Sequence, residues 1–487
     1  MRTYARTLTW MAVAVGAFHA AYASAYASLL MLVYLFALLQ LAHADRWRLA
    51  FYPGLAVGLL IAGVRLAFFW RIFSGGACAL WLVYALWIGL FVTLARLCFR
   101  RAKWGWLLLP LVWTGLEYFR SELYYLRFSW LNIGYAFTGA PWQALLATTG
   151  VYGAGFLLMI CAAVAAWRWP TSRVQAAVML LLGAGGIWLG GRIVPEAVPA
   201  GQPALVRVAG VQMEFPSETE LMLRLNDLVK RYPSTELLVL SEYTLDGPIP
   251  QKLKDWCREQ HRYLIVGGKD PLPGGKFYNT AFVVGPDGNI IFRQVKAVPI
   301  QFFKDGLPAP EQKLWESPWG RIGICICYDL SYARVVDRLI RLGAQALIVP
   351  TMDMSDWGAD QHALHARIAP ARAAEYGVPI FRLASSGISQ WADRHGIIFA
   401  SAPCPGDGAT LTGDLDLGEP GRLPPDRWVA PFAVGLTALL ICWFLSDQAR
   451  QLARGRARPA DGVGTTAPAA AVAGSEASRV PTHPTLP

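Results

Sequence analysis

The sequence predicts a fold in two parts, an α-helical membrane bundle with eight spans and an α/β domain. The chain has 487 residues, is 55% hydrophobic and has a positive mean hydropathy, which is too apolar for a purely soluble enzyme. Its long apolar runs lie in the first 192 residues and near the C-terminus. Between residues 205 and 415 no run is long enough to cross about 30 Å of hydrocarbon, and short apolar segments alternate with helical patterns there.

The membrane part is oriented by its lysine and arginine residues. We predict spans at 7–24, 26–43, 49–70, 77–97, 104–119, 143–167, 174–192 and 428–446. Basic clusters near 2–6, 46–48, 96–103, 168–173 and 450–458 then fall on one side, which the positive-inside rule makes cytoplasmic. This predicts a seven-span domain at 1–192, an extracytoplasmic domain at 193–425, an eighth span at 426–448 and a cytoplasmic tail at 449–487.

The two ends of the chain need separate interpretation. Residues 1–24 begin with basic residues and end in small ones, as a secretory signal does, but six more predicted spans follow, which favours an uncleaved anchor. The tail from about residue 459 is rich in Ala, Pro, Gly, Ser and Thr and is predicted to be disordered. Cytoplasmic loops and the tail account for the net charge of +11, so nucleic-acid binding is not indicated.

The pattern of residues 205–415 predicts an α/β domain. Several of its apolar segments have no polar face, which is typical of strands buried on both sides. We predict helices at 218–231, 331–343 and 361–376, and a Gly-Pro-Asp-Gly turn at 285–288. The predicted strands lie at 206–212, 236–241, 263–267, 280–284, 290–295, 321–328, 346–350 and 380–385.

Three polar residues, Glu242, Lys296 and Cys327, each lie at the end of a predicted strand. A thiol with a pKa of about 8.5 is mostly protonated at neutral pH, so a nucleophilic cysteine needs a base and a cation beside it. We predict Glu242 as the general base and Lys296 as the group that stabilises the thiolate and then the oxyanion, with the backbone N–H of Tyr328 as a second donor. This chemistry requires no metal and no cofactor.

The alternative for the cysteine is structural burial, since Cys325 would share a strand face with Cys327. The eight cysteines give no disulfide framework, and the sequence leaves open whether Cys257 and Cys404 pair. His362 and His365 lie one helical turn apart without a further cluster of ligands, so we predict a pair on a helix surface and no metal site.

The segment 321–330, Arg-Ile-Gly-Ile-Cys-Ile-Cys-Tyr-Asp-Leu, resembles the nucleophile segment of the nitrilase, or carbon-nitrogen hydrolase, superfamily. Glu242, Lys296 and Cys327 match the superfamily's catalytic triad in order. The resemblance implies that the α/β domain is an αββα sandwich.

The whole arrangement resembles the apolipoprotein N-acyltransferase family, a membrane-embedded branch of that superfamily. The motifs that carry this resemblance lie at 52–58, 68–70, 130–135 and 151–156 in the membrane part and at 361–362, 371–375 and 382–387 in the outer domain. The membrane motifs matter most because soluble amidases share the triad but lack them. Their other interpretation is ordinary packing, since small and aromatic residues pack spans in any case.

This resemblance implies an enzyme of the bacterial inner membrane that acts as a monomer. Its acyl donor would be a phospholipid and its acceptor the N-terminal amine of an S-diacylglyceryl-cysteine lipoprotein, with a thioester on Cys327 between them. Substrate-binding roles are implied for Tyr328, Asp305 and Trp357. The apolar residues Ile300, Phe302, Phe303 and Trp357 are candidates to cover an acyl chain, with core packing as the alternative.

Several positions depart from the family pattern. Asp305 stands near the position of a second glutamate after the lysine, Ser241 replaces a proline, and Asp329 replaces a glutamate. The segment 351–358 matches the family's Asn-Asp-Ala-Trp-Phe-Gly element only in part. Three other functions therefore remain open: a membrane-tethered amidase that uses water as acceptor, an inactive scaffold, and a transporter marked by Arg65 and Glu117.

Overall fold

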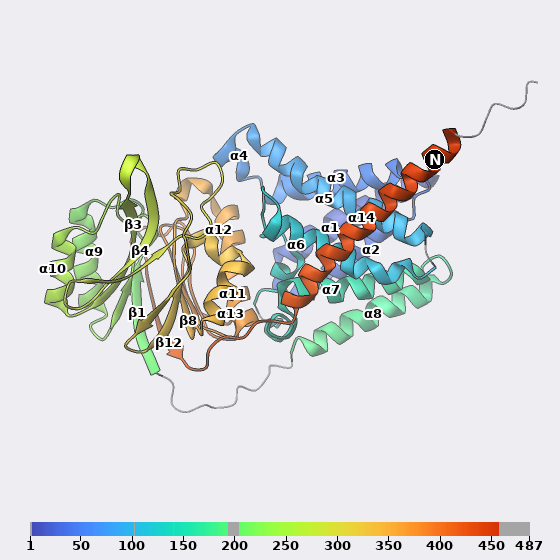
Figure 1. Cartoon of the computed structure of the whole chain (residues 1–487). Helices are drawn as coiled ribbons and strands as arrows, with labels where there is room; N and C mark the ends of the chain where they lie inside the picture. Colours follow the sequence, from blue (N-terminus) through green and yellow to red (C-terminus); the bar gives the residue numbers. More distant parts are fainter. Residues whose placement is uncertain (1, 102, 140, 193–203, 457–487) are drawn as a thin grey trace, which may run out of the picture. The chain divides into compact units, whose positions relative to one another are not determined.

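A computed structural model describes residues 2–101, 103–139, 141–192 and 204–456 of the chain (Figure 1). Residues up to Leu439 form one unit, which contains both a helical part and an α/β domain. The C-terminal helix α14 (Asp426–Arg456) begins in this unit and continues beyond it. The tail from about residue 459, which was predicted to be disordered, lies outside the described residues.

The helical part is built from α1 (Arg2–Ala23), α2 (Leu30–Ala42), α3 (Arg48–Arg65), α4 (Phe69–Phe73), α5 (Gly76–Arg101), α6 (Leu109–Tyr118), α7 (Gln143–Arg168) and α8 (Arg173–Gly190). Within the described ranges, five helices are long and apolar enough to cross a membrane, namely α3, α5, α7, α8 and α14. The count of eight spans therefore stays a prediction. The span predicted at 49–70 is two helices, because α3 ends at Arg65 and α4 begins at Phe69.

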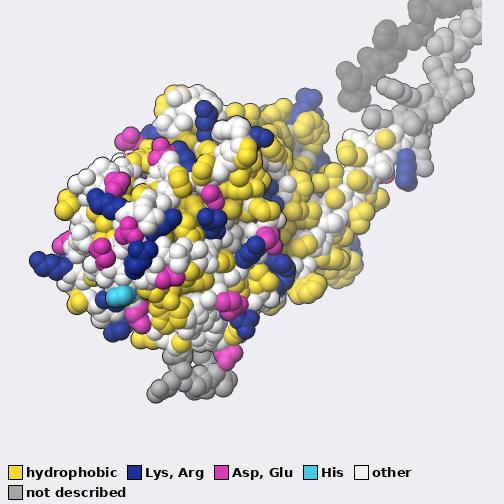
Figure 2. All heavy atoms as spheres, turned by 60° about the vertical axis from the view of Figure 1, so that its left-hand side comes forward, with side chains coloured by type: hydrophobic (Ala, Val, Ile, Leu, Met, Phe, Trp, Pro, Cys, Tyr) yellow, Lys and Arg dark blue, Asp and Glu magenta, His cyan; other side chains and the backbone are white. Residues whose placement is uncertain are grey.

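Small residues bring α3 and α5 into close contact. A Cβ atom on Gly58 would lie 2.5 Å from Cα of Ala85, and one on Gly54 would lie 3.1 Å from Cα of Gly89. The motif at 52–58 thus packs two helices backbone to backbone, as small residues do in membranes. Figure 2 shows hydrophobic side chains over the surface of the helical part, whereas charged ones gather on the α/β domain.

The α/β domain contains two six-stranded sheets. The first has the order β12-β1-β2-β3-β4-β5 and the second β11-β10-β9-β8-β7-β6. The strands of the first sheet are β1 (Ala204–Val211), β2 (Leu237–Val239), β3 (Tyr263–Pro271), β4 (Phe277–Val284), β5 (Ile290–Val295) and β12 (Thr410–Leu417). Those of the second are β6 (Leu314–Ser317), β7 (Gly320–Ile324), β8 (Ala346–Thr351), β9 (Ile380–Ala384), β10 (Ser389–Ala392) and β11 (Ile398–Ala402).

Two helical layers enclose the sheets, as an αββα sandwich requires (Figure 1). The first sheet is covered by α9 (Glu218–Arg231) and α10 (Gln251–Gln260), and the second by α11 (Ala333–Arg341), α12 (Ala359–Ala366) and α13 (Ile368–Tyr376). The sheets face each other so closely that a Cβ atom on Gly210 of β1 would lie 2.7 Å from the side chain of Leu383 of β9. The predicted nitrilase-like α/β fold is confirmed.

The predicted elements differ from the observed ones in seven places. All eight predicted strands exist, but β6, β10, β11, β12 and helix α10 were missed. The strand predicted at 321–328 ends at Ile324. The helix predicted at 361–376 is two helices that meet at Arg367. The missed strands β10, β11 and β12 carry Ser, Thr, Asp and Gly among their apolar residues, which weakens the apolar signal.

Candidate active site

Cys327 lies at a sharp turn just beyond β7. The strand ends at Ile324, and a 3-10 helix (Cys327–Ser331) begins at the cysteine itself. The φ angle of Cys327 is 52°, in the left-handed region that residues other than glycine seldom adopt, so the backbone is strained at this cysteine. Because the strand ends before Cys325, the two cysteines do not share a strand face, and that prediction was wrong.

Asp329 ties this turn to the loop that follows Lys296. Its carboxylate accepts hydrogen bonds from the backbone N–H groups of Ile326 at 3.3 Å, Ala297 at 3.0 Å and Val298 at 2.7 Å. Burial raises the pKa of Asp329 to about 6, although these N–H groups and Lys296 act to lower it. The cysteine turn and the lysine loop therefore form one rigid unit.

Glu242, Lys296 and Asp305 form a buried cluster of charges, which we call the catalytic cluster. Lys296 Nζ lies 2.8 Å from Glu242 Oε1 and 2.7 Å from Asp305 Oδ2. Asn279 Nδ2 donates to Glu242 Oε1 at 2.6 Å and to Asp305 Oδ1 at 2.8 Å. Burial lowers the pKa of Lys296, but Asp305 and Glu242 raise it well above its ordinary value. Lys296 is therefore held in its charged form.

The backbone of Met352 links Glu242 to Cys327. Its N–H donates to Glu242 Oε2 at 2.9 Å, and its carbonyl oxygen lies 3.6 Å from the Cys327 Sγ. Burial raises the pKa of the Cys327 thiol well above its ordinary value, and Glu242 raises it further while Lys296 lowers it. Cys327 thus rests as a thiol whose neighbouring carboxylate is placed to accept the proton.

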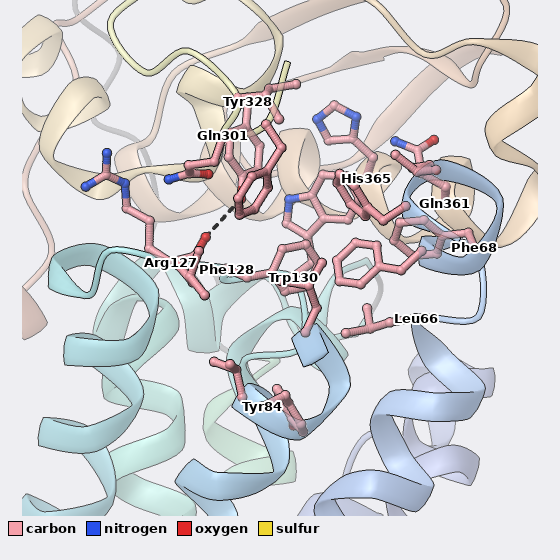
Figure 3. Close-up of a pocket in the computed structure, with 18 of the residues that line it drawn as sticks. Leu66, Phe68, Tyr84, Arg127, Phe128, Trp130, Gln301, Tyr328, Gln361 and His365 are labelled. Carbon is pink, nitrogen blue, oxygen red and sulfur yellow. Dashed lines mark hydrogen bonds between the residues drawn. The ribbon is translucent and has the colours of Figure 1, made fainter. Parts of the chain in front are cut away.

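Cys327 is one of the residues that line an apolar cavity. Figure 3 shows many of the side chains around this cavity. It has a volume of about 950 Å³, part of which is open to solvent. Residues of α4, α5 and the segment 126–130 form one wall, and residues of the α/β domain form the other. The lining includes Leu66, Phe68, Phe69, Phe73, Tyr84, Trp87, Arg120, Arg127, Phe128, Trp130, Ile300, Gln301, Phe302, Phe303, Cys327, Tyr328, Trp357, Gln361 and His365.

The predicted substrate-binding residues occupy two different places. Tyr328 and Trp357 line the cavity, and the hydroxyl of Tyr328 donates to the backbone oxygen of Arg127 at 3.2 Å (Figure 3). Asp305 is not part of the lining and instead contacts Lys296, Asn279 and the hydroxyl of Tyr243 at 2.8 Å. The structure therefore places Asp305 behind the lysine.

The loop at 300–303 contributes apolar side chains to the cavity. Phe302 and Phe303 are 69% and 41% exposed, so core packing is the wrong interpretation for these two residues. Their rings contact Phe73 of α4, with centroids 6.0 and 5.8 Å apart. Exposed aromatic side chains at the mouth of an apolar cavity are suited to contact a hydrocarbon chain.

Two family models match the chain. The apolipoprotein N-acyltransferase N-terminal domain matches residues 7–164, and the carbon-nitrogen hydrolase model matches residues 207–424. The chain belongs to the apolipoprotein N-acyltransferase family. Together the two models cover both the helical part and the α/β domain. A soluble carbon-nitrogen hydrolase would have no counterpart of the helical part. As a member of this family the chain is an acyltransferase.

Individual proteins resemble this chain over different shares of its length. The apolipoprotein N-acyltransferase of Geobacter metallireducens is 26% identical over 358 residues, covering 64% of this chain and 68% of its own. The omega-amidase NIT2 of Bos taurus is 29% identical over 116 residues, which is 22% of this chain and 42% of the amidase. The crystal structure of Saccharomyces cerevisiae Nit3 is 22% identical with a TM-score of 0.38 and covers 44% of this chain and 90% of its own.

In this N-acyltransferase a membrane-side motif contacts the cysteine turn. Trp130 Nε1 donates to Ser331 Oγ at 3.0 Å, and the hydroxyl of Ser129 donates to the backbone oxygen of Ser331 at 3.3 Å. Ser331 is the last residue of the 3-10 helix that begins at Cys327. The motif at 130–135 is therefore more than generic span packing, because it braces the turn that begins at Cys327.

Arg372 braces the same turn from the other side. It donates to the backbone oxygens of Leu330 at 3.1 Å and Ser331 at 2.9 Å. Its partner is Glu375, whose other oxygen accepts from Arg427 at 2.9 Å. The motif at 371–375 thus supports the N-acyltransferase site without lining the cavity.

The two histidines of α12 are buried, so the prediction of a helix-surface pair was wrong. His365 lines the cavity and lies 2.8 Å from Asp353, and His362 contacts the Cys404 thiol and the backbone oxygen of Met354. The helix is covered because Trp130 of the helical part stacks on His365. All eight cysteines are unpaired in the described structure, including Cys257.

Three residues of the site were missed by sequence reasoning, namely Asn279, Asp353 and His365. Asn279 could have been found, because it is a polar residue in the apolar strand β4 (Phe277–Val284). Asp353 and His365 gave no such signal, since each lies in a segment of mixed composition.

Proposed function

We propose that this acyltransferase moves a fatty acyl chain from a phospholipid, through a thioester on Cys327, to the N-terminal amine of S-diacylglyceryl-cysteine lipoproteins. The observation that carries the proposal is the apolar cavity, because Cys327 and residues of α4 and α5 line the same space. A nucleophile that opens onto a wall of membrane-helix residues is suited to a lipid ester. The family and the relatives named above support lipoprotein N-acylation in general.

The first half-reaction forms the thioester. Glu242 accepts the proton of the Cys327 thiol, and the thiolate attacks the carbonyl carbon of the sn-1 ester. Lys296 and the backbone N–H of Tyr328 stabilise the oxyanion that forms. The C–O bond then breaks, and Glu242 returns its proton to the departing lysophospholipid alkoxide. Glu242 ends this step as a carboxylate, ready for the second half-reaction.

Asp305 does the work of the family's second glutamate in this proposal. Its carboxylate is 2.7 Å from Lys296 Nζ and is held by Tyr243, Asn279 and the N–H of Ile300. It keeps Lys296 charged while Glu242 changes protonation state, since Lys296 would otherwise lose its contacting carboxylate in mid-reaction. The side chain of Asp305 is shorter than that of glutamate, but its carboxylate still contacts Lys296 directly.

The proposed setting is the bacterial inner membrane, with the catalytic domain on the periplasmic face. Exposed apolar residues on α8 support a lipid-facing surface, since Val174, Leu181 and Leu182 are each 70–74% exposed. The basic clusters named above support the orientation. The eighth span, α14, would return the chain to the cytoplasm.

The second candidate is a membrane-tethered amidase with the same triad. The likeness to omega-amidase supports this second candidate, but it covers only 22% of the chain. The aromatic and aliphatic lining of the cavity disfavours a small polar amide, because such a ligand needs more polar partners than this wall offers.

The test uses the purified full-length chain in phospholipid micelles with a synthetic diacylglyceryl-cysteine peptide, alongside Cys327→Ala. The proposal predicts that the peptide gains the mass of one acyl chain and that the gain vanishes in the variant. Acylation of Cys327 without any modified peptide would indicate another acceptor. Release of free fatty acid or ammonia alone, with amide substrates, would favour the amidase.

A further inference from the structure

A second acid–base pair, outside the catalytic cluster, faces the same cavity as Cys327. His365 of α12 lines the cavity, although only 2% of the residue is exposed. Its Nδ1 lies 2.8 Å from Asp353 Oδ1, and Asp353 is completely buried. The first half-reaction described above uses neither residue. A buried histidine that is aligned by a carboxylate and opens onto a reaction space has the arrangement of a general base.

The surroundings of Asp353 determine which of the two ring nitrogens of His365 carries the proton. Burial raises the pKa of Asp353, but His365 and Arg382 lower it well below its ordinary range, so the carboxylate is ionised. An ionised oxygen 2.8 Å from Nδ1 requires an N–H there, which leaves the lone pair of the neutral ring on Nε2. Arg382 Nη2 is 3.0 Å from the same Nδ1 because both groups donate to Asp353.

Nε2 of His365 is the ring nitrogen that makes no hydrogen bond among the described residues. It is not one of the buried atoms that lack a partner, so it is accessible from the cavity that His365 lines. Trp130 fixes the ring plane by stacking on it, with centroids 4.6 Å apart and an interplanar angle of 14°. Figure 3 shows the two rings together at the upper side of the cavity.

The pair lies close to the nucleophile. Met352, whose carbonyl oxygen is 3.6 Å from the Cys327 Sγ, immediately precedes Asp353 in the chain. The Trp130 ring that stacks on His365 also makes an edge contact with Tyr328, the residue after Cys327, at 6.1 Å. One short segment and one tryptophan therefore hold both the thiol and the histidine at the same cavity.

Proton counting shows why a second base is needed. An α-amino group has a pKa of about 7.7–8.0, so near neutral pH it arrives mostly as an ammonium ion. Its nitrogen must lose two protons to become a neutral amide, whereas the departing Cys327 sulfur takes back only one. Glu242 can carry one proton at a time, because one of its oxygens is held by Lys296 and Asn279 and the other by the Met352 N–H.

We propose that His365 is a catalytic residue of the second half-reaction and that its Nε2 accepts the first proton from the acceptor's α-ammonium group. The inference rests on the proposed function. The neutral amine then attacks the thioester carbonyl carbon, forming the C–N bond. Glu242 takes the second proton from that nitrogen and delivers it to the sulfur as the C–S bond breaks. The proton on His365 leaves to solvent, which restores both bases.

The charges around His365 suit this role. Burial lowers the pKa of His365, Asp353 raises it, and Arg382 and His362 lower it, with a net decrease. The remaining neighbours named above, Trp130 and Gln361, are uncharged. His365 is therefore neutral near pH 7 and able to accept a proton, and Asp353 stabilises the imidazolium that forms.

The test separates the two half-reactions in the full-length chain. Acylation of Cys327 is followed by intact mass with phospholipid alone, and transfer is then followed after addition of the diacylglyceryl-cysteine peptide. In His365→Asn the amide of asparagine replaces Nδ1 as the partner of Asp353, but nothing replaces Nε2. We expect unchanged acylation and a transfer rate lowered roughly 100-fold at pH 7, in the range of general-base effects. The deficit should shrink toward pH 9, where the amine is already neutral.

The controls make the failures distinguishable. His261→Asn changes an exposed histidine in a left-handed conformation that asparagine tolerates, and it should leave both steps unchanged. His365→Gln places an amide near Nε2 without a base and should match His365→Asn. Transfer at the wild-type rate in either variant, or an equal loss of both steps at every pH, would overturn the inference. If the wild-type chain itself acylates Cys327 but never the peptide, the proposed function fails, and the inference fails with it.

Discussion

The catalytic cluster and a second buried group of charges differ in what surrounds them. The second group, the junction cluster, consists of Arg372, Glu375 and Arg427. Arg427 lies 2.9 Å from Glu375 and also pairs with Asp337 at 2.8 Å. The junction cluster is as deeply buried as the catalytic cluster, with no residue more than 8% exposed. Buried charge is therefore common to both and does not by itself identify a catalytic site.

The difference lies in the neighbours of each cluster. The catalytic cluster is next to a thiol on a strained turn, and that thiol lines an apolar cavity. The junction cluster is surrounded by other protein groups, and Arg372 donates to the backbone oxygens of Leu330 and Ser331. None of its members lines the cavity. We infer that one cluster performs chemistry and the other holds the turn, α13 and the start of α14 together.

The largest effect is expected at the nucleophile. Cys327→Ala should abolish acyl transfer while changing the free energy of unfolding by less than about 1.5 kcal/mol, because the substitution removes only one buried atom. Peptide mass and thermal unfolding in detergent measure the two quantities. Substantial transfer by the variant would move the chemistry away from this cluster.

The junction cluster should give the opposite pattern. Glu375→Gln leaves Arg372 and Arg427 without their shared carboxylate, so we expect the unfolding free energy to fall by about 3–5 kcal/mol. Acylation per folded molecule should be nearly unchanged. Asp227→Asn, which removes the exposed partner of Arg231, is the control and should cost less than about 1 kcal/mol. Loss of activity in Glu375→Gln at full stability would erase the distinction between the clusters.

A smaller effect on the rate is expected from substitution of Asp305, which contacts Lys296. Asp305→Asn removes one of the two carboxylates that raise the pKa of Lys296, so the lysine should stabilise the oxyanion less well, and we expect acylation of Cys327 to slow by about tenfold. Asp305→Glu tests the family's residue type at this position and should retain most activity. An unchanged rate in Asp305→Asn would show that Glu242 alone suffices.

The smallest effect is a shift in pH dependence. Burial raises the pKa of Glu242 above its ordinary 4.5, against the lowering effect of Lys296. Because the carboxylate must be ionised to accept the thiol proton, acylation should fall as the pH drops through that raised pKa. Asp329, with a pKa of about 6, is the competing cause. If the acid limb of the rate profile disappears in Asp329→Asn, the limb belongs to Asp329 and not to Glu242.

The grouping of Glu242, Lys296 and Cys327 was predictable because each residue follows an apolar segment. The segments before Glu242, Lys296 and Cys327 have few polar residues, so a charged or thiol side chain at their ends stands out. Parallel pairing of β7 and β8, and of β1, β2 and β3, brings such strand ends together. The apolar segments predicted only an α/β domain, and the resemblance to the nitrilase superfamily narrowed it to αββα layers.

His365 was not predictable, because the surface that buries it comes from another part of the chain. The composition of α12 is nearly neutral between apolar and polar, and Trp130 lies 235 residues earlier in the sequence. A pattern read along one helix cannot report a partner at that distance. The same reason explains why Glu375 appeared as a motif without a role, since its partner Arg427 is in α14.

The most direct test of the account is the mass of the peptide that contains Cys327 after incubation of the full-length chain with phospholipid and no acceptor. The account predicts one added fatty acyl chain on Cys327, released by hydroxylamine as a thioester is. An unmodified Cys327 in the presence of lysophospholipid formation, or an acyl chain on another residue, would contradict it.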